Sequence, residues 1–376
     1  MILITGDCKS SSAQGIRYTA LFGRHLYARS KMICYSPQCD SIENLDMFSV
    51  TSSTSLISKM LRVMQRRTIY PDPYIFRIQA YKRKLMQIES CDPKGNVIIG
   101  CTPFSLLLLV PLLKRVNSSL PVIVDMSDPF SFNMGNYRRP IRTHIARSIE
   151  KTSFPHIHKI VVLNECIREQ YGHIYPLWKK KFMVIEQGVD ESFIKSVRSE
   201  STIERENISF TFLYAGGFYK KGRNPSELYK AFEAQKESCR LSVYGNIIKS
   251  LRPSGSDNIA YHRAIDKDML ARITAQADAL ILMDNDYGYQ VPGKTLETLA
   301  SGKPVLYIYN NEASPTLKYI REARGVVWAK NNASDIVIAI KRIINGDHEE
   351  PFFYYEPYTW DKMRSKYDIL LKGTYQ

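Results

Sequence analysis

Short apolar runs alternate with longer amphipathic segments along the whole chain. Several runs are apolar throughout, which is typical of strands covered on both faces, as in a parallel sheet. Strands that alternate with segments of helical pattern predict a parallel α/β fold. The predicted strands are 2–5, 31–36, 96–100, 121–126, 159–163 and 181–186 in the first half and 210–216, 240–245, 258–262, 277–283, 303–309 and 325–329 in the second.

The chain is long enough for two such domains. Either half of its 376 residues can bury a core of its own. A polar, charge-dense segment separates the two series of strands and has the composition of a linker. We therefore predict two Rossmann-like, doubly wound domains that face each other across a cleft. Along the chain we predict an N-terminal domain (1–190), a linker (191–208), a C-terminal domain (209–356) and a C-terminal helix (357–376) that returns to the N-terminal domain.

Positive charge is concentrated in the first half of the chain. Residues 1–190 hold 26 Lys and Arg against 14 Asp and Glu, net +12, whereas residues 191–376 hold 26 against 23, net +3. In 59–84 the basic residues are mixed with apolar and aromatic ones, which suits a membrane surface bearing anionic lipid. A solvated pair of basic helices is the alternative. The basic residues there are Lys59, Arg62, Arg66, Arg67, Arg77, Lys82, Arg83 and Lys84.

One uncharged stretch, 95–113, approaches the length that spans a membrane. Gly100, Pro103 and Pro111 divide it, so we predict a strand, a turn and a helix that is kinked at Pro111. The first residues lack the basic flank of a signal peptide, and we expect none. Seven scattered cysteines, without metal-ligand spacing, favour a reducing compartment without disulfides or structural metal.

The segment YQVPGKTLETLASGKPVLYI (289–308) contains the most informative motif. A loop reaches Pro292 and Gly293, a helix then opens, and GKP returns the chain to a buried strand. Proline and glycine at a helix start leave backbone N–H groups pointing outward, where the helix dipole favours phosphate. Glu297, one turn further on, is placed to accept hydrogen bonds from a ribose diol. A plain strand–helix–strand unit is the alternative interpretation.

This segment resembles the donor-site motif of retaining glycosyltransferase family 4, whose members have the GT-B fold. They typically carry P-[SG]-K-x-x-E-x-[LM]-A-x-G-[KL]-P-V, and PGKTLETLASGKPV matches it. Further segments resemble the family in the same order along the chain. They are ITGDCKSSSAQGIRYTALFGRHL, GCTPFSLLLLVPLLKRVNSSLPVIVDMSDPF with its D-x-x-D-P-[WF] end, IHKIVVLNECIREQYGHIYP followed by FMVIEQGVDESF, and FLYAGGFYKKGRNPSELYKAF.

The resemblance implies a donor site for a nucleoside diphosphate sugar in the C-terminal domain. The glycine-containing basic loop after the first strand of that domain approaches and neutralises the diphosphate; a solvated turn is the alternative for its charges. Tyr244-Gly245 and His262-Arg263-Ala264 frame the base, and Gly15 faces the donor from the other domain. The implied donor-binding residues are Gly15, Gly216, Gly217, Lys220, Lys221, Arg223, Gly245, Arg263, Val291, Pro292, Gly293, Lys294 and Glu297.

The sequence departs from the family pattern at the donor sugar and leaves the catalytic group open. Tyr289 stands eight residues before the helix Glu, where many members carry a second Glu, so the sugar contact is altered. Asp284-Asn285-Asp286 has the spacing of a metal-binding D-x-D, but we favour a chance match or a contact to sugar hydroxyls. Retaining transfer is usually explained by front-face attack, in which the leaving diphosphate takes the acceptor proton. If a base exists, Asp128 is the candidate, with a turn-capping role before Pro129 as the alternative.

These features predict a glycosyltransferase that moves a sugar from a nucleotide sugar to a saccharide or lipid-linked glycan, with retention, in surface polysaccharide biosynthesis. We expect a cytoplasmic protein, peripheral at the inner face of the membrane, with no bound cofactor, no requirement for a divalent metal and no nucleic acid partner. Its partners are the donor, the acceptor and an anionic membrane surface. The alternatives are a GT-B nucleotide-sugar epimerase and a non-catalytic GT-B adaptor that binds anionic polymers or membranes.

Overall fold

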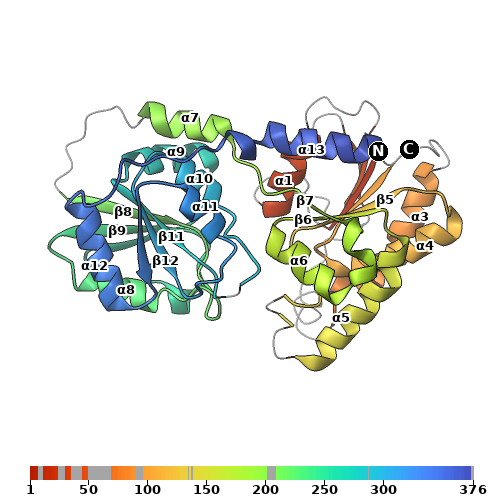
Figure 1. Cartoon of the computed structure of the whole chain (residues 1–376), viewed down its shortest axis with the longest axis horizontal. Coiled ribbons are helices and arrows are strands. Elements are labelled where there is room, and N and C mark those ends of the chain that lie inside the picture. The colour runs from red at the N-terminus through yellow and green to blue at the C-terminus, as the bar shows by residue number, and fades with distance from the viewer. Residues whose placement is uncertain are drawn as a thin grey trace. The chain divides into compact units, whose positions relative to one another are not determined.

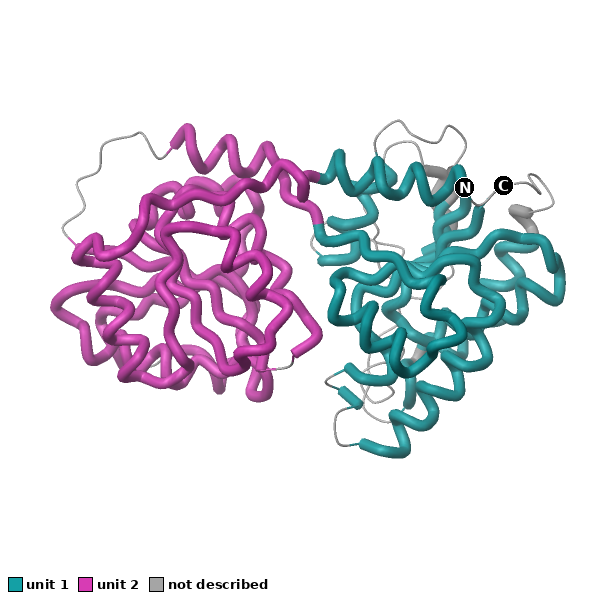
Figure 2. Tube along the Cα trace, viewed as in Figure 1, with its two compact units in different colours: residues 1–187, 360–376 teal, residues 188–359 magenta. Residues whose placement is uncertain are grey.

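The computed structural model describes residues 1–6, 12–23, 30–34, 45–49, 69–89, 96–133, 135–136, 139–200, 209–253, 255–286 and 288–373. Each of its two compact units contains a parallel sheet with helices packed against it (Figure 1). Unit 1 comprises residues 1–187 and 360–376, and unit 2 comprises residues 188–359 (Figure 2). In the described part of the chain, no helix is both long enough and apolar enough to cross a membrane.

Unit 1 has a seven-stranded sheet of order β3-β2-β1-β4-β5-β6-β7. Its strands are β1 (Ile2–Thr5), β2 (Ser30–Cys34), β3 (Leu45–Ser49), β4 (Val97–Gly100), β5 (Val122–Met126), β6 (Lys159–Val162) and β7 (Phe182–Val184). Its helices are α1 (Ala13–Phe22), η1 (Pro73–Arg77), α3 (Ile78–Glu89), η2 (Phe104–Leu108), α4 (Leu109–Val116), α5 (Pro140–Ser153), η3 (Phe154–His156), α6 (Glu165–Ile174), η4 (Pro176–Lys181) and α13 (Trp360–Lys372).

A buried ion pair joins the first helix of unit 1 to its sheet. Arg17 on α1 donates from Nε to Asp125 Oδ2 on β5 at 3.1 Å, and both side chains are almost fully buried. The guanidinium also donates to the backbone oxygens of Glu186 (2.8 Å) and Ile185 (3.0 Å). Tyr367 on α13 donates its hydroxyl to the same Asp125 oxygen. The C-terminal helix is thereby fixed to the N-terminal sheet, beside the point where the chain leaves unit 1.

Unit 2 has a six-stranded sheet of order β10-β9-β8-β11-β12-β13. Its strands are β8 (Phe210–Ala215), β9 (Cys239–Tyr244), β10 (Ile259–His262), β11 (Ala279–Met283), β12 (Val305–Tyr309) and β13 (Val326–Lys330). Its helices are α7 (Glu191–Glu200), α8 (Ser226–Glu233), η5 (Lys249–Leu251), α9 (Lys267–Gln276), α10 (Thr295–Ala300), α11 (Leu317–Glu322), α12 (Ala333–Ile344) and η6 (Glu356–Tyr358).

The segment 191–208 is not a linker over its first half. Residues 191–200 form α7, whose apolar residues Phe193, Ile194 and Val197 are buried in the core of unit 2 together with Leu270 of α9. These side chains follow helical spacing, but the charged residues between them make the segment look polar when it is read as a whole. Residues 201–208 lie outside the described residues.

Within the described residues every predicted strand is present, with ends that differ by a residue or two, and one strand there was not predicted. The missed strand, β3, pairs in parallel with β2 at the edge of the sheet. Its sequence LDMFS mixes polar and apolar residues, so it lacks the continuous apolar run of an inner strand. Pro111 is the third residue of α4, directly after η2. No kink in mid-helix is needed, because the first helical turn does not require its backbone N–H.

Candidate functional site

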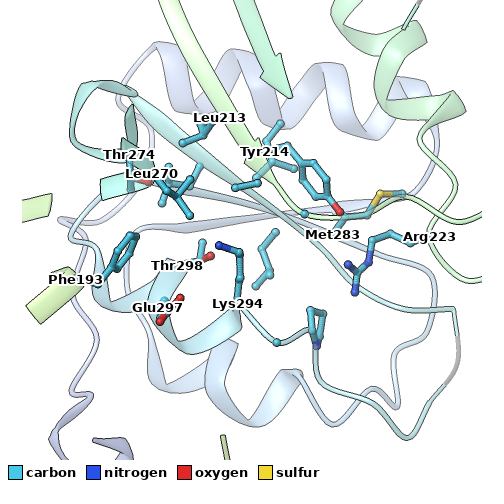
Figure 3. A pocket seen from close by; sticks show the side chains of 17 residues that line it. Phe193, Leu213, Tyr214, Arg223, Leu270, Thr274, Met283, Lys294, Glu297 and Thr298 are labelled. Atoms are coloured by element: carbon cyan, nitrogen blue, oxygen red, sulfur yellow. The ribbon is translucent and has the colours of Figure 1, made fainter. Parts of the chain in front are cut away.

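A pocket lies in unit 2 at the point where the order of its strands reverses. β8 and β11 are neighbours in the sheet although β9 and β10 stand between them in sequence. Doubly wound sheets bind ligands at the carboxyl ends of strands at such a switch point. The cavity, of about 150 Å³, is lined by the last residues of β8, by β11, by α9 and by the start of α10 (Figure 3). The predicted donor residues that line it are Gly216, Arg223, Pro292, Gly293, Lys294 and Glu297.

The helix expected to bind phosphate is short. α10 spans only Thr295–Ala300, and the turn before it is closed by Thr295 N, which donates to Pro292 O at 2.9 Å. Because a helix macrodipole is the sum of aligned peptide dipoles, a helix of this length adds little charge by itself. The positive charge of the pocket therefore depends on side chains.

Lys294 supplies one of these charges. The residue is exposed overall, but its side chain points into the pocket (Figure 3). Burial of the ammonium group lowers the pKa of Lys294, and the nearby charge of Glu297 opposes this effect. An anion bound beside a desolvated ammonium replaces the water that the group has lost, so this position favours a negatively charged ligand.

Glu297, one turn into α10, belongs to an ion-pair network that begins at the start of unit 2. Lys267 Nζ on α9 lies 3.4 Å from Glu297 Oε1 and 2.6 Å from Asp190 Oδ2. Burial alone would raise the pKa of Asp190, but hydrogen bonds from Lys267 and Ser192 outweigh it, and the pKa falls to about 2. Lys267 thus holds the Glu297 carboxylate in place beside the pocket.

Arg223 supplies the second cation, from the loop that follows β8. It donates from one terminal nitrogen to Asn285 Oδ1 at 2.8 Å and from the other to Gly217 O at 3.4 Å. Its Nε is buried without a hydrogen-bond partner in the described part of the chain. These two hydrogen bonds fix the orientation of the guanidinium, so its positive charge is held at the lining of the pocket.

Both carboxylates of Asp284-Asn285-Asp286 accept hydrogen bonds from other groups of the protein. Asp284 is buried and accepts hydrogen bonds from Tyr307 Oη (2.6 Å), Thr316 Oγ1 (2.9 Å) and the Asn285 backbone (2.8 Å). Burial raises its pKa. Asp286 accepts from Gly222 N at 3.2 Å while its own N donates to Gly222 O at 2.7 Å. The triplet therefore shapes the loop that carries Arg223.

Two glycine positions bring the ends of β8 and β9 close together. A Cβ on Gly245 would stand 1.9 Å from the backbone oxygen of Gly216, so only glycine fits there. Gly216 N in turn donates to Tyr244 O at 2.9 Å. Gly245 thus positions the loop at the pocket rather than lining it. At the next strand end the His262 ring stacks on Tyr244, with ring centroids 4.4 Å apart.

The other predicted site residues lie outside the pocket lining. Lys220, Lys221, His262, Arg263 and Ala264 are exposed, and Gly217, Val291 and Tyr289 are partly buried. Gly15 and Asp128 belong to unit 1. Gly15 is buried in α1, where its N donates to the Ser12 side chain at 3.0 Å, and Asp128 is partly buried in the turn after β5.

Sequence reasoning missed the apolar wall of the pocket and the Lys267 pair. Phe193 of α7, Leu270 and Thr274 of α9, and Leu213 of β8 line the cavity. Leu270 and Thr274 are one helical turn apart, which marks a common face but does not say what that face covers. Lys267 is the first residue of its helix, a position where solvation is the ordinary expectation.

No protein-family model matches the sequence, and no curated protein is significantly similar to it in sequence. Solved structures match it over nearly the whole length of both chains. Sucrose-phosphate synthase from Thermosynechococcus elongatus has a TM-score of 0.71 at 12% identity and covers 100% of this chain and 98% of its own. Anabaena HepE in complex with UDP and glucose has a TM-score of 0.65 at 9% identity, and the match covers 99% of each chain. UDP-GlcNAc 2-epimerase from Methanocaldococcus jannaschii has a TM-score of 0.57 at 10% identity, and this match also covers 99% of each chain.

These similarities establish the fold. Each unit has the Rossmann-like strand order of a doubly wound domain, and the two units together match the GT-B fold. At identities of 9 to 12% the comparison shows architecture alone, since one fold hosts many reactions. The presence of an epimerase among the neighbours illustrates this.

Proposed function

We propose that the chain is a glycosyltransferase that takes its sugar from a nucleoside diphosphate sugar bound in unit 2. The observation that carries the proposal is the pocket at the β8/β11 switch point, which is lined by the cations Arg223 and Lys294 and by the Glu297 carboxylate. Two cations and one carboxylate complement a ligand that has an anionic diphosphate and a neutral diol. The names of two structural neighbours, a sucrose-phosphate synthase and a protein bound to UDP and glucose, support this assignment.

In this proposal Lys294 and Arg223 bind the diphosphate. Charge-assisted hydrogen bonds to phosphate are stronger than neutral ones, and ammonium and guanidinium groups carry several N–H donors that can form them. The same two cations stabilise the charge that develops on the leaving diphosphate, which is where electrostatic catalysis acts. Lys220 and Lys221, exposed in the same loop, add positive charge on the approach to the site.

Glu297 binds the ribose hydroxyls in this scheme. Ionised carboxylates only accept hydrogen bonds, and a diol offers two donors. Lys267 serves as a positioning residue, because its ammonium lies 3.4 Å from Glu297 Oε1 and leaves the rest of the carboxylate available.

The remaining expectations belong to the same proposal. Transfer proceeds with retention by front-face attack, without a resident cofactor or divalent metal, and Gly15 and Asp128 of unit 1 act on the donor and acceptor side. The acceptor is a saccharide or a lipid-linked glycan of surface polysaccharide biosynthesis. The protein works in the cytoplasm, docked on the inner face of the membrane, which its excess of basic residues supports.

The test is a thermal-shift measurement with UDP, GDP, ADP and CMP at millimolar concentration. Ligand at a hundred times its Kd stabilises the folded state by about 2.7 kcal/mol, which is a readily measured shift. Lys294→Ala and Glu297→Ala should each weaken binding by roughly tenfold to a hundredfold. Lys341→Ala, an exposed lysine on α12, is the matched control. The proposal fails if none of the nucleotides stabilises the wild-type protein.

An epimerase is the second candidate because one structural neighbour is a UDP-GlcNAc 2-epimerase. An epimerase changes its nucleotide sugar without an acceptor, whereas a transferase releases the nucleoside diphosphate and needs an acceptor to do so productively. Incubation of the protein with each stabilising nucleotide sugar, followed by analysis of the sugar configuration, separates the two. A change of configuration without an acceptor would replace the transferase proposal.

A further inference from the structure

Helix α5 of unit 1 separates its charges between two faces. The only acidic residue from Arg139 to Ser153 is Glu150, and it is buried. Its carboxylate accepts hydrogen bonds from Ser131 N (3.0 Å), Tyr171 Oη (2.9 Å) and Tyr175 Oη (2.6 Å). The carboxyl group of this helix is therefore turned inward and hydrogen-bonded.

The outward face of α5 carries basic and large apolar side chains. Ile141 is 76% exposed and Ile145 is 38% exposed. They are four residues apart, so they lie on the same face, one turn from each other. The exposed basic residues that accompany them are His144, Arg147 and Lys151 on the helix and Arg139 directly before its first residue. We call this surface the α5 face; it contains no carboxylate.

This combination differs from an ordinary solvated helix. A single exposed isoleucine needs no explanation, since folded proteins expose much apolar surface. Two isoleucines one turn apart, on a helix face whose charged side chains are all lysine and arginine, match the pattern of helices that lie in a membrane interface. There the apolar side chains enter the acyl boundary while the lysine and arginine side chains reach anionic head groups.

We propose that the α5 face docks unit 1 on a membrane surface that contains anionic lipid. The inference rests on the proposed function for its purpose, because a lipid-linked acceptor would be met at such a surface. Charge complementarity selects an anionic partner, and the isoleucines select lipid over nucleic acid. A phosphodiester backbone offers nothing apolar in which Ile141 can be buried.

Sedimentation with vesicles of phosphatidylcholine, with and without phosphatidylglycerol, tests the proposal on the full chain. The wild-type protein should bind the anionic vesicles, bind neutral ones weakly and be released by high salt. Each basic residue near an anionic surface contributes roughly a fivefold gain in partitioning. The triple variant Arg139→Gln/Arg147→Gln/Lys151→Gln should therefore lose binding by on the order of a hundredfold.

A control variant carries the same change in net charge elsewhere. Lys236→Gln/Arg240→Gln/Lys341→Gln removes three exposed cations from unit 2 and should leave vesicle binding nearly unchanged. A second comparison replaces Arg77 of η1 and Arg83 of α3 by Gln, two exposed basic residues elsewhere in unit 1. Equal loss in the unit 2 variant, or loss in the η1/α3 variant with none in the α5 variant, overturns the assignment of the α5 face.

Fluorescence gives a readout that does not depend on removing charge. Ile141→Trp should shift its emission to the blue on anionic vesicles, because the ring enters the interface. Ile338→Trp, at a position that is 59% exposed on α12 of unit 2, should not shift. An unshifted Ile141→Trp spectrum on vesicles that bind the protein overturns the proposal. So does binding of the wild-type protein to RNA but to neither kind of vesicle.

The stabilisation of each variant by nucleotide separates the two proposals. If nucleotide shifts remain while vesicle binding is absent in the wild-type protein, the docking face is wrong and the donor site stands. If vesicle binding follows the α5 face while no nucleotide binds, the donor site is wrong and the docking face stands.

Discussion

Replacing Arg17 by methionine should destabilise unit 1 more than any surface change. The guanidinium makes three hydrogen bonds inside the protein, to Asp125 and to the backbone oxygens of Glu186 and Ile185. Methionine keeps much of the side-chain volume but leaves Asp125 as a buried carboxylate without its cation. Removing one partner of a buried ion pair costs about 3–5 kcal/mol.

This loss is a large fraction of the stability of a domain, which is about 5–15 kcal/mol in total. For a unit of this size each kcal/mol lowers Tm by about 2–4 °C, so Arg17→Met should lower the Tm of unit 1 by about 6–20 °C. Differential scanning calorimetry measures the effect. Because the pocket belongs to unit 2, stabilisation by the bound nucleotide should persist below the new transition.

The double variant Arg17→Met/Asp125→Leu separates the pair itself from the loss of packing. If the cost comes from an uncompensated carboxylate, removing that carboxylate should recover much of the stability, as happens when apolar residues replace whole buried ion pairs. A drop below about 1 kcal/mol in the single variant would refute the reasoning. A double variant as unstable as the sum of the single ones would do the same.

Three further predictions concern unit 2. Gly245→Ala places a Cβ 1.9 Å from Gly216 O, so it should lower the free energy of unfolding by about 1–3 kcal/mol or more and also weaken nucleotide binding. Gly293→Ala, with no atom within 4 Å of its Cβ, should leave Tm unchanged. Equal Tm values for the two variants would contradict the close packing at Gly245. Nucleotide affinity, measured by calorimetry from neutral to alkaline pH, should fall as pH rises through the lowered pKa of Lys294, since only the ammonium form attracts phosphate. Lys294→Arg, which stays protonated, should abolish that fall. The pKa of Asp190 in the folded protein is about 2, below its unfolded value of about 3.9. Its carboxylate therefore stabilises the fold fully above about pH 3.9, and this contribution is lost as the pH falls toward 2. Asp190→Asn should flatten the acid limb of a Tm–pH curve, and an unchanged limb would argue against the ion pair with Lys267.

The strands could be predicted because their signal is local. An inner parallel strand is a short apolar run, and such runs are visible in any window of the chain. The edge strand β3 and the helix α7 were missed for related reasons. The exposed positions of α7 dominate its composition, and only the spacing of Phe193, Ile194 and Val197 shows the buried side.

The candidate site was predictable in its charges but not in its geometry. The motif around Lys294 and Glu297 and the loop with Arg223 could be found because their residues are close in sequence. Which basic side chains of that loop turn inward depends on contacts with Asn285 and Gly217, and the pairing of Lys267 with Glu297 spans 30 positions. Tertiary structure alone decides such contacts.

The chain passes from unit 1 to unit 2 after residue 187 and returns to unit 1 at residue 360, so unit 2 is an insertion in unit 1. Val189 N donates to Tyr358 O at 2.8 Å, and Val189 pairs with Thr359, so the two ends of 188–359 lie side by side. On the other border, Lys366 of α13 binds Glu186 at 2.7 Å. A segment whose ends are adjacent can be excised without stretching what remains. The span 188–359 should therefore be producible as a free domain on which the proposed nucleotide binding can be measured, and unit 1 should close over a short bridge in its place.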